Sequence, residues 1–168
     1  MSKTVDETPA PPLLDRYTPW AGSVARLIVG GVWLVAGGLK VTDLRSSIRA
    51  VQVYELLPNS MAEIVGIALP LIEVGIGVLL ILGLATQAGA VVSSLLLLAF
   101  IVGIASAWAR GLQIDCGCFG GGGQLGEGET PQYLVEILRD IGLLALSGLL
   151  VWRPTTRYSI DSILFRTK

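Results

Sequence analysis

Four long hydrophobic segments dominate the pattern of apolar and polar positions along this 168-residue chain. They cover residues of about 21–39, 61–84, 87–108 and 132–152. Each is close to the roughly 20 residues with which an α-helix crosses about 30 Å of hydrocarbon. The pattern therefore predicts an all-α, polytopic membrane protein, in which the four helices form a bundle over residues 21–152.

The fourth segment differs from the others, because Glu136, Arg139 and Asp140 interrupt its first half. A charge at membrane depth costs about 2.5–3.5 kcal/mol on insertion scales, so these side chains must face protein or a wet cavity. Glu136 and Asp140 are four residues apart and share a helix face, with Arg139 beside them. Glu73 lies at comparable depth in the second segment, which makes an Arg139–Glu73 or an Arg139–Asp140 ion pair feasible. Such charges either fix the register of the helices, or move protons as the thiols are oxidised, or polarise a quinone-like acceptor.

The segments outside the four spans differ in character. Residues 41–60 mix apolar and basic positions, which predicts a short amphipathic helix at the membrane interface, ended by Leu57-Pro58-Asn59. Lys40 and Arg26 flank the first span, where snorkelling to the interface is the ordinary explanation. Residues 1–20 are interpreted as a disordered cytoplasmic tail and residues 153–168 as a cytoplasmic C-terminal tail.

The connection over residues 109–130 carries the most distinctive motif, Cys116-Gly117-Cys118. These are the only two cysteines of the chain. A disulfide between such close neighbours closes almost no loop and adds little stability, whereas a strained, exposed bond suits thiol–disulfide exchange. The motif therefore favours a redox pair. The alternative is two unpaired thiols packed at the membrane surface, or one bonded to another subunit.

The distribution of Lys and Arg predicts the orientation. With four spans, both termini share one side, which carries more basic residues than the side of the cysteine loop. This bias favours cytoplasmic termini and an extracytoplasmic loop, in a compartment where disulfides persist. The basic residues compared are Lys3, Arg16, Arg26, Arg153, Arg157, Arg166 and Lys168 against Lys40, Arg45, Arg49 and Arg110.

The composition excludes several classes of function. The chain is 52% hydrophobic and only 15% charged, which is too apolar for an ordinary soluble domain. Its net charge of −1 and the lack of a basic stripe argue against nucleic-acid binding. Without histidine, zinc could add only carboxylates such as Asp115, Glu127 and Glu129 to the thiols, which argues against a structural zinc site. A quinone stays open as a cofactor, although no binding motif supports it.

Several short motifs together resemble the DoxX-like superfamily and, within it, the MauE-type redox-associated membrane proteins of methylamine utilisation. The resemblance covers about residues 21–152. It implies a four-helix protein of the bacterial plasma membrane that works with a thioredoxin-like partner on disulfides of extracytoplasmic proteins. It further implies that Cys116 and Cys118 are the redox pair and that Glu73, Arg139 and Lys40 are polar partners. The motifs are Gly37-Gly38-Leu39-Lys40, Tyr54-Glu55-Leu56-Leu57-Pro58, Leu71-Ile72-Glu73-Val74-Gly75, Cys116-Gly117-Cys118-Phe119-Gly120 and Arg139-Asp140.

The sequence thus predicts a membrane relay that passes electrons through Cys116 and Cys118 to or from a soluble thioredoxin-like protein. Intramembrane support would come from Glu73, Arg139, Asp140, Glu136 and Lys40. Whether the relay is an enzyme, a thiol-disulfide oxidoreductase, stays open at this point. Two alternatives also stay open: a non-catalytic scaffold or anchor for a redox partner, and a small transporter whose path is lined by the intramembrane charges.

Overall fold

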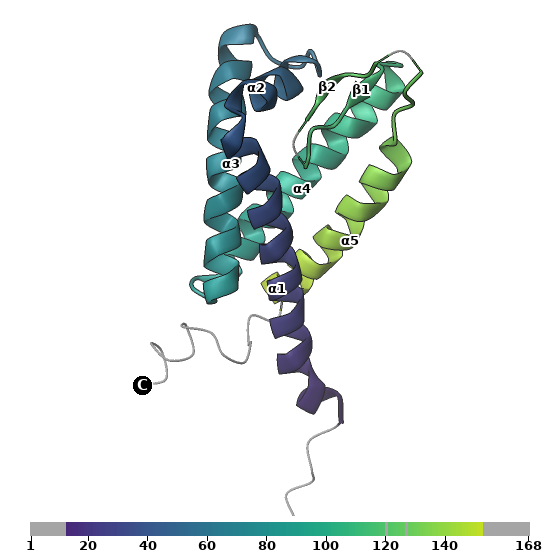
Figure 1. Ribbon diagram of the computed structural model, residues 1–168. Coiled ribbons are helices and arrows are strands. Elements are labelled where there is room, and N and C mark those ends of the chain that lie inside the picture. The colour runs from purple at the N-terminus through teal and green to yellow at the C-terminus, as the bar shows by residue number, and fades with distance from the viewer. Residues whose placement is uncertain (1–12, 120, 127, 153–168) are drawn as a thin grey trace, which may run out of the picture.

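The computed structural model describes residues 13–119, 121–126 and 128–152, and within them the chain is almost entirely helical. Four long helices, one short helix and a two-stranded hairpin follow one another along the chain (Figure 1). This confirms the predicted all-α membrane fold. The elements are α1 (Leu13–Thr42), α2 (Leu44–Gln52), α3 (Asn59–Leu82), α4 (Thr86–Ala109), β1 (Ile114–Asp115), β2 (Gly123–Gln124) and α5 (Tyr133–Trp152).

The long helices pack as two pairs, α1 against α3 and α4 against α5, and α5 also contacts α1. α2 and the hairpin lie together at one end of the bundle, and the turn from α3 to α4 lies at the other end (Figure 1). The α1–α3 contact is close because Gly30 and Gly77 face each other. A Cβ at Gly77 would lie 2.9 Å from the Gly30 carbonyl oxygen. Glycine pairs of this kind allow helix backbones to approach in a membrane.

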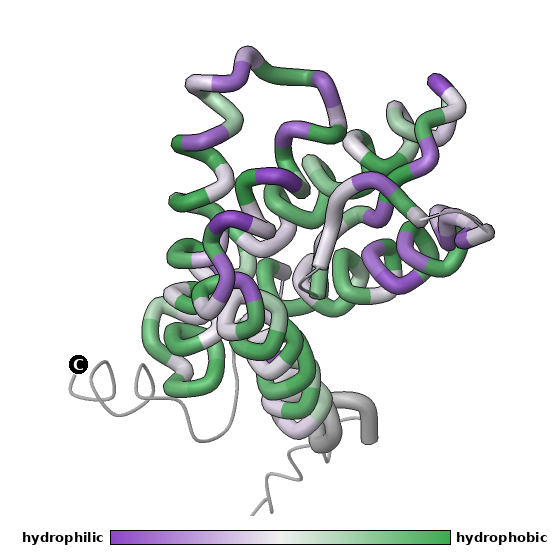
Figure 2. Tube along the Cα trace, turned by 45° about the horizontal axis from the view of Figure 1, so that its top comes forward, coloured by the Kyte–Doolittle hydropathy of each residue, from purple (hydrophilic) through white to green (hydrophobic). Residues whose placement is uncertain are grey.

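Among the residues that the structure describes, three helical stretches are long and apolar enough to cross a membrane: Trp20–Thr42, Asn59–Leu82 and Thr86–Ala109. α5 is not one of them, because three charged residues stand in its first half. Its outward face is nevertheless apolar, with Leu134, Val135 and Leu138 exposed, whereas Asp140 is buried. The charged residues of α5 thus turn inward, as their cost in lipid requires. Along the long helices, Figure 2 shows mainly hydrophobic residues.

The interior contains a small apolar core and a chain of polar contacts. Val29, Trp33, Ile76, Leu80 and Leu97 form the core cluster in the middle of the bundle. Trp33 is the largest side chain of this cluster. Its indole nitrogen donates to Ser93 Oγ at 2.7 Å, and Ser93 Oγ lies 3.0 Å from Ser147 Oγ. These hydrogen bonds connect α1, α4 and α5 across the core.

A proline inside α3 determines how α2 docks. Pro70 has no N–H, so the carbonyl of Gly66, four residues earlier, loses its helical partner. The Ser47 hydroxyl of α2 donates to this carbonyl at 2.8 Å. α2 can come this close because Gly66 has no side chain; a Cβ there would lie 2.6 Å from Ile48 Cα. α2 is therefore fixed to the side of α3.

Two predicted boundaries are wrong. Residues 13–20 were assigned to a disordered tail, but they form the first turns of α1. Hydrophobicity marks the part of a helix that suits lipid, and it does not mark where the backbone hydrogen bonds of the helix begin. The interfacial helix ends at Gln52 and not at Leu57-Pro58-Asn59, and it buries Ser46, Ser47 and Ala50, because these small residues fit against α3 and the cysteine loop. The remainder of the predicted tails, residues 1–12 and 153–168, lies outside the described residues.

Candidate functional site

The cysteine loop contains the β1–β2 hairpin. Ile114 pairs with Gln124, and Asp115 with Gly123, in an antiparallel ladder. The loop is tied to α5 because the backbone N–H of Ile114 donates to the Tyr133 hydroxyl at 3.2 Å, and this hydroxyl in turn donates to Leu112 O. The hairpin thus fixes the base of the segment that holds the sulfurs.

Two glycines let the tip of the loop settle on α2. Gly117 and Gly122 have positive φ angles of 67° and 79°, which side-chain-bearing residues adopt at a cost. A Cβ on Gly117 would lie 2.7 Å from Ala50 Cβ, and one on Gly122 would lie 2.6 Å from the same atom. The Ser46 hydroxyl adds a 2.7 Å hydrogen bond to Gly121 O. The small residues of α2 therefore form the surface on which the cysteine loop rests.

The two cysteines are free thiols in different surroundings. Cys118 is only 8% exposed, whereas Cys116 is half-buried. The turn between them is held by two short-range contacts: Gly117 N–H donates to Asp115 Oδ1 at 3.0 Å, and Cys118 N–H donates to Cys116 Sγ at 3.3 Å. Cys116 is thus the sulfur that a molecule arriving from solvent can reach first.

The proton on the pair is shared unequally. The pKa of Cys118 lies below the usual value of a thiol, because the Cys116 thiol donates a hydrogen bond to its sulfur, with the cations of Arg139 and Lys40 adding to the effect. The same shared hydrogen bond raises the pKa of Cys116, and burial raises it further. In this shared hydrogen bond Cys116 is thus the donor and Cys118 the acceptor, with the greater thiolate character.

The intramembrane charges form two ion pairs. Lys40 Nζ of α1 lies 2.6 Å from Glu73 Oε1 of α3, and both side chains are buried. Arg139 Nη2 lies 2.9 Å from Asp140 Oδ1 within α5, which is one of the two pairs predicted for Arg139. The other, Arg139–Glu73, is wrong, because Glu73 bonds to Lys40. Snorkelling is also wrong for Lys40, because its ammonium is drawn inward by a carboxylate that has no water to solvate it.

Cys116 and two nearby carboxylates form a group of three potential metal ligands. One carboxylate oxygen each from Asp115 and Glu136 and the sulfur of Cys116 lie within 4.8 Å of one another. Glu136, predicted as a polar support, therefore belongs to the surroundings of the cysteine pair. Three donors with two carboxylates could hold a divalent cation or, equally, accept the proton of the thiol.

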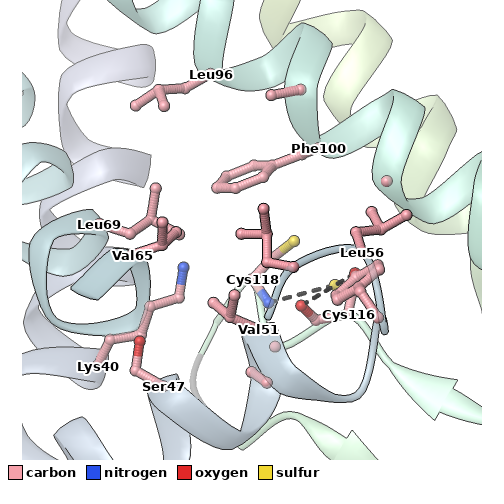
Figure 3. A pocket seen from close by; sticks show the side chains of 16 residues that line it. Lys40, Ser47, Val51, Leu56, Val65, Leu69, Leu96, Phe100, Cys116 and Cys118 are labelled. Atoms are coloured by element: carbon pink, nitrogen blue, oxygen red, sulfur yellow. Dashed lines mark hydrogen bonds between the residues drawn. The ribbon is translucent and has the colours of Figure 1, made fainter. Parts of the chain in front are cut away.

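A cavity of about 290 Å³ opens beneath the cysteine pair. Figure 3 shows Lys40 of α1, Phe100 of α4 and both cysteines on its walls, together with aliphatic side chains from α2, α3 and α4. Its lining is predominantly apolar. The sequence pattern did not indicate this cavity, because it is lined by four helices and by the cysteine loop, which are far apart along the chain.

Tyr54 and Arg110 also belong to the site, and Tyr54 had no assigned role in the sequence motifs. Tyr54 lines the cavity and donates its hydroxyl to Cys116 O at 3.3 Å. Burial raises the pKa of Tyr54, so its phenol stays protonated and remains a donor. Arg110 donates to the backbone carbonyl of Tyr54. The available signal was the motif Tyr54-Glu55-Leu56-Leu57-Pro58, which contributed to the resemblance but had no assigned function.

Comparisons with known proteins identify the family of this chain. The family described as "Methylamine utilisation protein MauE" matches residues 18–153, a stretch that contains every site residue described above. The chain belongs to the MauE family. A curated MauE of Paracoccus denitrificans, named a methylamine utilization protein, is 28% identical over 136 residues. The match covers 80% of this chain and 69% of the MauE of Paracoccus denitrificans. No solved structure matches.

The MauE family match and the three apolar helical spans lead to the same conclusion. This is a multi-pass bacterial membrane protein. The wider DoxX-like superfamily remains a resemblance in short motifs. The MauE match does not by itself give the chemistry of the cysteines, which has to be argued from their geometry.

Proposed function

We propose that this MauE-family protein is a membrane thiol–disulfide relay that acts through Cys116 and Cys118 on an extracytoplasmic, thioredoxin-like partner. The observation that carries the proposal is the pair itself: two free thiols with unequal exposure and unequal proton affinity, held on α2 by two glycines. A pair that served only to staple the loop would add little, since it closes a ring of three residues.

The unequal surroundings suggest a role for each sulfur. In the oxidised relay, a thiolate of the partner attacks Cys116, the more accessible sulfur, and Cys118 leaves as a thiolate with the electron pair of the broken bond. The second thiolate of the partner then attacks its own sulfur in the mixed disulfide and releases Cys116. The partner ends oxidised and the relay reduced. A leaving thiol of low pKa speeds the first step, and this fits Cys118.

The side of the membrane follows from charge. With four spans, the bias of Lys and Arg toward the side of the termini supports an extracytoplasmic loop. The MauE of Paracoccus denitrificans is named for methylamine utilisation. We propose that this chain serves such a process by setting the thiol state of an extracytoplasmic protein, because its reactive side chains are thiols, and not by converting an amine itself.

Trapping a mixed disulfide tests the relay. In the reverse reaction Cys116 attacks the disulfide of an oxidised partner and Cys118 then releases that partner. Cys118→Ser blocks this release, so Cys116 should accumulate in a disulfide with an oxidised extracytoplasmic protein, visible on non-reducing gels and identifiable by mass spectrometry. Cys116→Ser is the matched control, because it leaves the buried sulfur and should trap far less. If neither variant traps an extracytoplasmic protein, or if a membrane-impermeant maleimide reaches the loop only from the cytoplasm, the relay is refuted.

A double variant separates the relay from the alternatives. Replacing both cysteines by serine should abolish disulfide transfer while leaving the protein folded. A scaffold would still bind its partner in this variant, and a transporter would still carry its substrate. Glu73→Gln, in contrast, should impair a transporter most. Retention of full disulfide transfer without both cysteines would show that the pair is not the reactive site.

A further inference from the structure

The cavity under the cysteine pair has the features of a binding site and not of a packing defect. Its volume of about 290 Å³ is near the lower end of small-molecule sites, which start at roughly 300 Å³. A single substituted ring fits a space of this size. Both cysteines line it, so an occupant would lie against the sulfurs.

The cavity opens toward lipid and not toward water. α3 and α4 are joined by a tight turn at one end of the bundle and diverge toward the other end, where the cavity lies (Figure 1). Leu56, Leu57 and Val65 line the cavity and are themselves exposed apolar side chains. An entrance bordered by exposed aliphatic groups in a membrane protein admits a lipid-soluble molecule more readily than a soluble one.

The few polar groups of the cavity are hydrogen-bond donors. Lys40 donates one of its three ammonium hydrogens to Glu73, and its nitrogen lies 5.5 Å from the centroid of the Phe100 ring. Tyr54 and Ser47 also line the space, but their hydroxyl hydrogens are already donated to Cys116 O and Gly66 O. Lys40 is therefore the donor open to an occupant. A molecule that accepts a hydrogen bond through an oxygen at the edge of a flat ring would bind Lys40 and lie along Phe100 (Figure 3).

We propose that this cavity binds the head group of a lipid-soluble quinone, which takes the electron pair of the reduced cysteines. The inference rests on the proposed relay and names its membrane oxidant. A quinone offers carbonyl oxygens to Lys40 and an electron-poor ring to Phe100 and the sulfurs. Cys118 is the sulfur adjoining Lys40 and the buried end of the pair, so it is the one that reacts with the ring.

The step balances without a further reactant. The Cys118 thiolate adds to a ring carbon of the quinone and forms a C–S bond. The Cys116 thiolate then attacks Cys118 Sγ, the S–S bond forms, and the C–S electron pair returns to the ring as hydroquinone. Two thiols lose two electrons and two protons, and the quinone gains both. The Lys40 ammonium stabilises the oxygen on which negative charge develops.

The test uses purified, reduced full-length protein in nanodiscs under anaerobic conditions, with a decyl-substituted benzoquinone as the probe. Disulfide formation between Cys116 and Cys118 is followed by mass spectrometry, and hydroquinone by its absorbance. The expected result is one hydroquinone per disulfide. Glutathione disulfide, which arrives from water, serves as the second oxidant.

Variants locate the reaction. Gly103 lines the cavity, and a Cβ there would lie 3.6 Å from the Tyr54 ring, so Gly103→Leu fills the space without a backbone clash. It should slow oxidation by the quinone about tenfold or more, because the ring loses its position beside the sulfur. Gly75→Leu is the matched control, since nothing lies within 4 Å of a Cβ at Gly75. Ala99→Leu, at another lining position, serves if Gly103→Leu does not fold.

The outcomes separate this inference from the relay. Oxidation by the quinone that Gly103→Leu slows and Gly75→Leu does not, with the glutathione reaction unchanged in both, supports the site. Oxidation by glutathione disulfide but not by the quinone overturns the quinone site and leaves the relay intact. A phospholipid chain held tightly in the cavity instead of the quinone has the same consequence. Equal effects of the two glycine variants overturn it as well. If neither oxidant reacts, the relay itself fails.

Discussion

Replacing Gly117 by alanine should lift the cysteine loop from α2, and the structure gives the size of the effect. Two costs arise. The φ angle of 67° is one that alanine adopts at about 1–2 kcal/mol. The added Cβ would lie 2.7 Å from Ala50 Cβ, an overpacking that costs about 1–3 kcal/mol. Because the steric cost is relieved when the loop lifts, the lifted state should gain about 5- to 140-fold in population.

The assay is the rate at which a water-soluble maleimide modifies Cys118, read by mass spectrometry of the peptide. Cys118 is 8% exposed, so its modification requires local opening and should accelerate by the same factor. Gly111→Ala is the matched control: its φ angle is 68°, and nothing lies within 4 Å of its Cβ. It incurs the backbone cost without the clash and should leave the rate at Cys118 nearly unchanged.

Ala50→Gly in the Gly117→Ala background should restore protection, because the nearest remaining atom to the new Cβ is then Gly122 Cα at 3.2 Å. The reasoning is refuted if Gly117→Ala and Gly111→Ala accelerate the reaction equally. It is also refuted if removing the methyl group of Ala50 fails to restore the slow rate. Either result would mean that α2 does not hold the loop.

Two further predictions concern the buried charges and the thiols. Lys40→Met should lower the free energy of unfolding by about 3–5 kcal/mol, because it leaves the buried carboxylate of Glu73 without its cation. Adding Glu73→Leu should recover most of this loss, as measured by thermal unfolding in detergent. Equal melting temperatures of the single and double variants would contradict this. Cys116→Ala removes the hydrogen-bond donor that lowers the pKa of Cys118, so the pH midpoint for alkylation of Cys118 should rise. Cys118→Ala removes the hydrogen bond that raises the pKa of Cys116, so the pH midpoint for alkylation of Cys116 should fall. Midpoints that move the opposite way would refute the shared hydrogen bond.

The helices could be predicted from sequence because lipid imposes a simple requirement on side chains. A run of about 20 apolar residues has few other uses, and charges in such a run must turn inward. α5 follows this rule: Asp140 is buried while Leu134 and Leu138 face outward. The position of the cysteine pair in a polar connection was also readable, because glycine-rich segments do not continue helices.

The contacts that define the site could not be predicted, because they depend on distances across the fold. Glu73 could have paired with Arg139 or Lys40 on charge alone, and only the close approach of α1 and α3 selects Lys40. The role of Ala50 as a seat for Gly117 and Gly122 leaves no signature in a short helix. The cavity arises because α3 and α4 diverge, and hydrophobicity contains no information about that angle.

The proline of α3 has a consequence for any attempt to engineer this protein. Pro70 leaves the Gly66 carbonyl without a hydrogen-bond donor from its own helix. The Ser47 side chain of α2 donates a hydrogen bond to this carbonyl instead. In hydrocarbon, a carbonyl without a hydrogen-bond donor costs several kcal/mol of stability, since no water can replace the lost donor. Residues 43–53 are thus no mere linker: exchanging them for an unrelated sequence would damage the transmembrane scaffold. A chimera between relatives should transfer this segment and α3 as one unit.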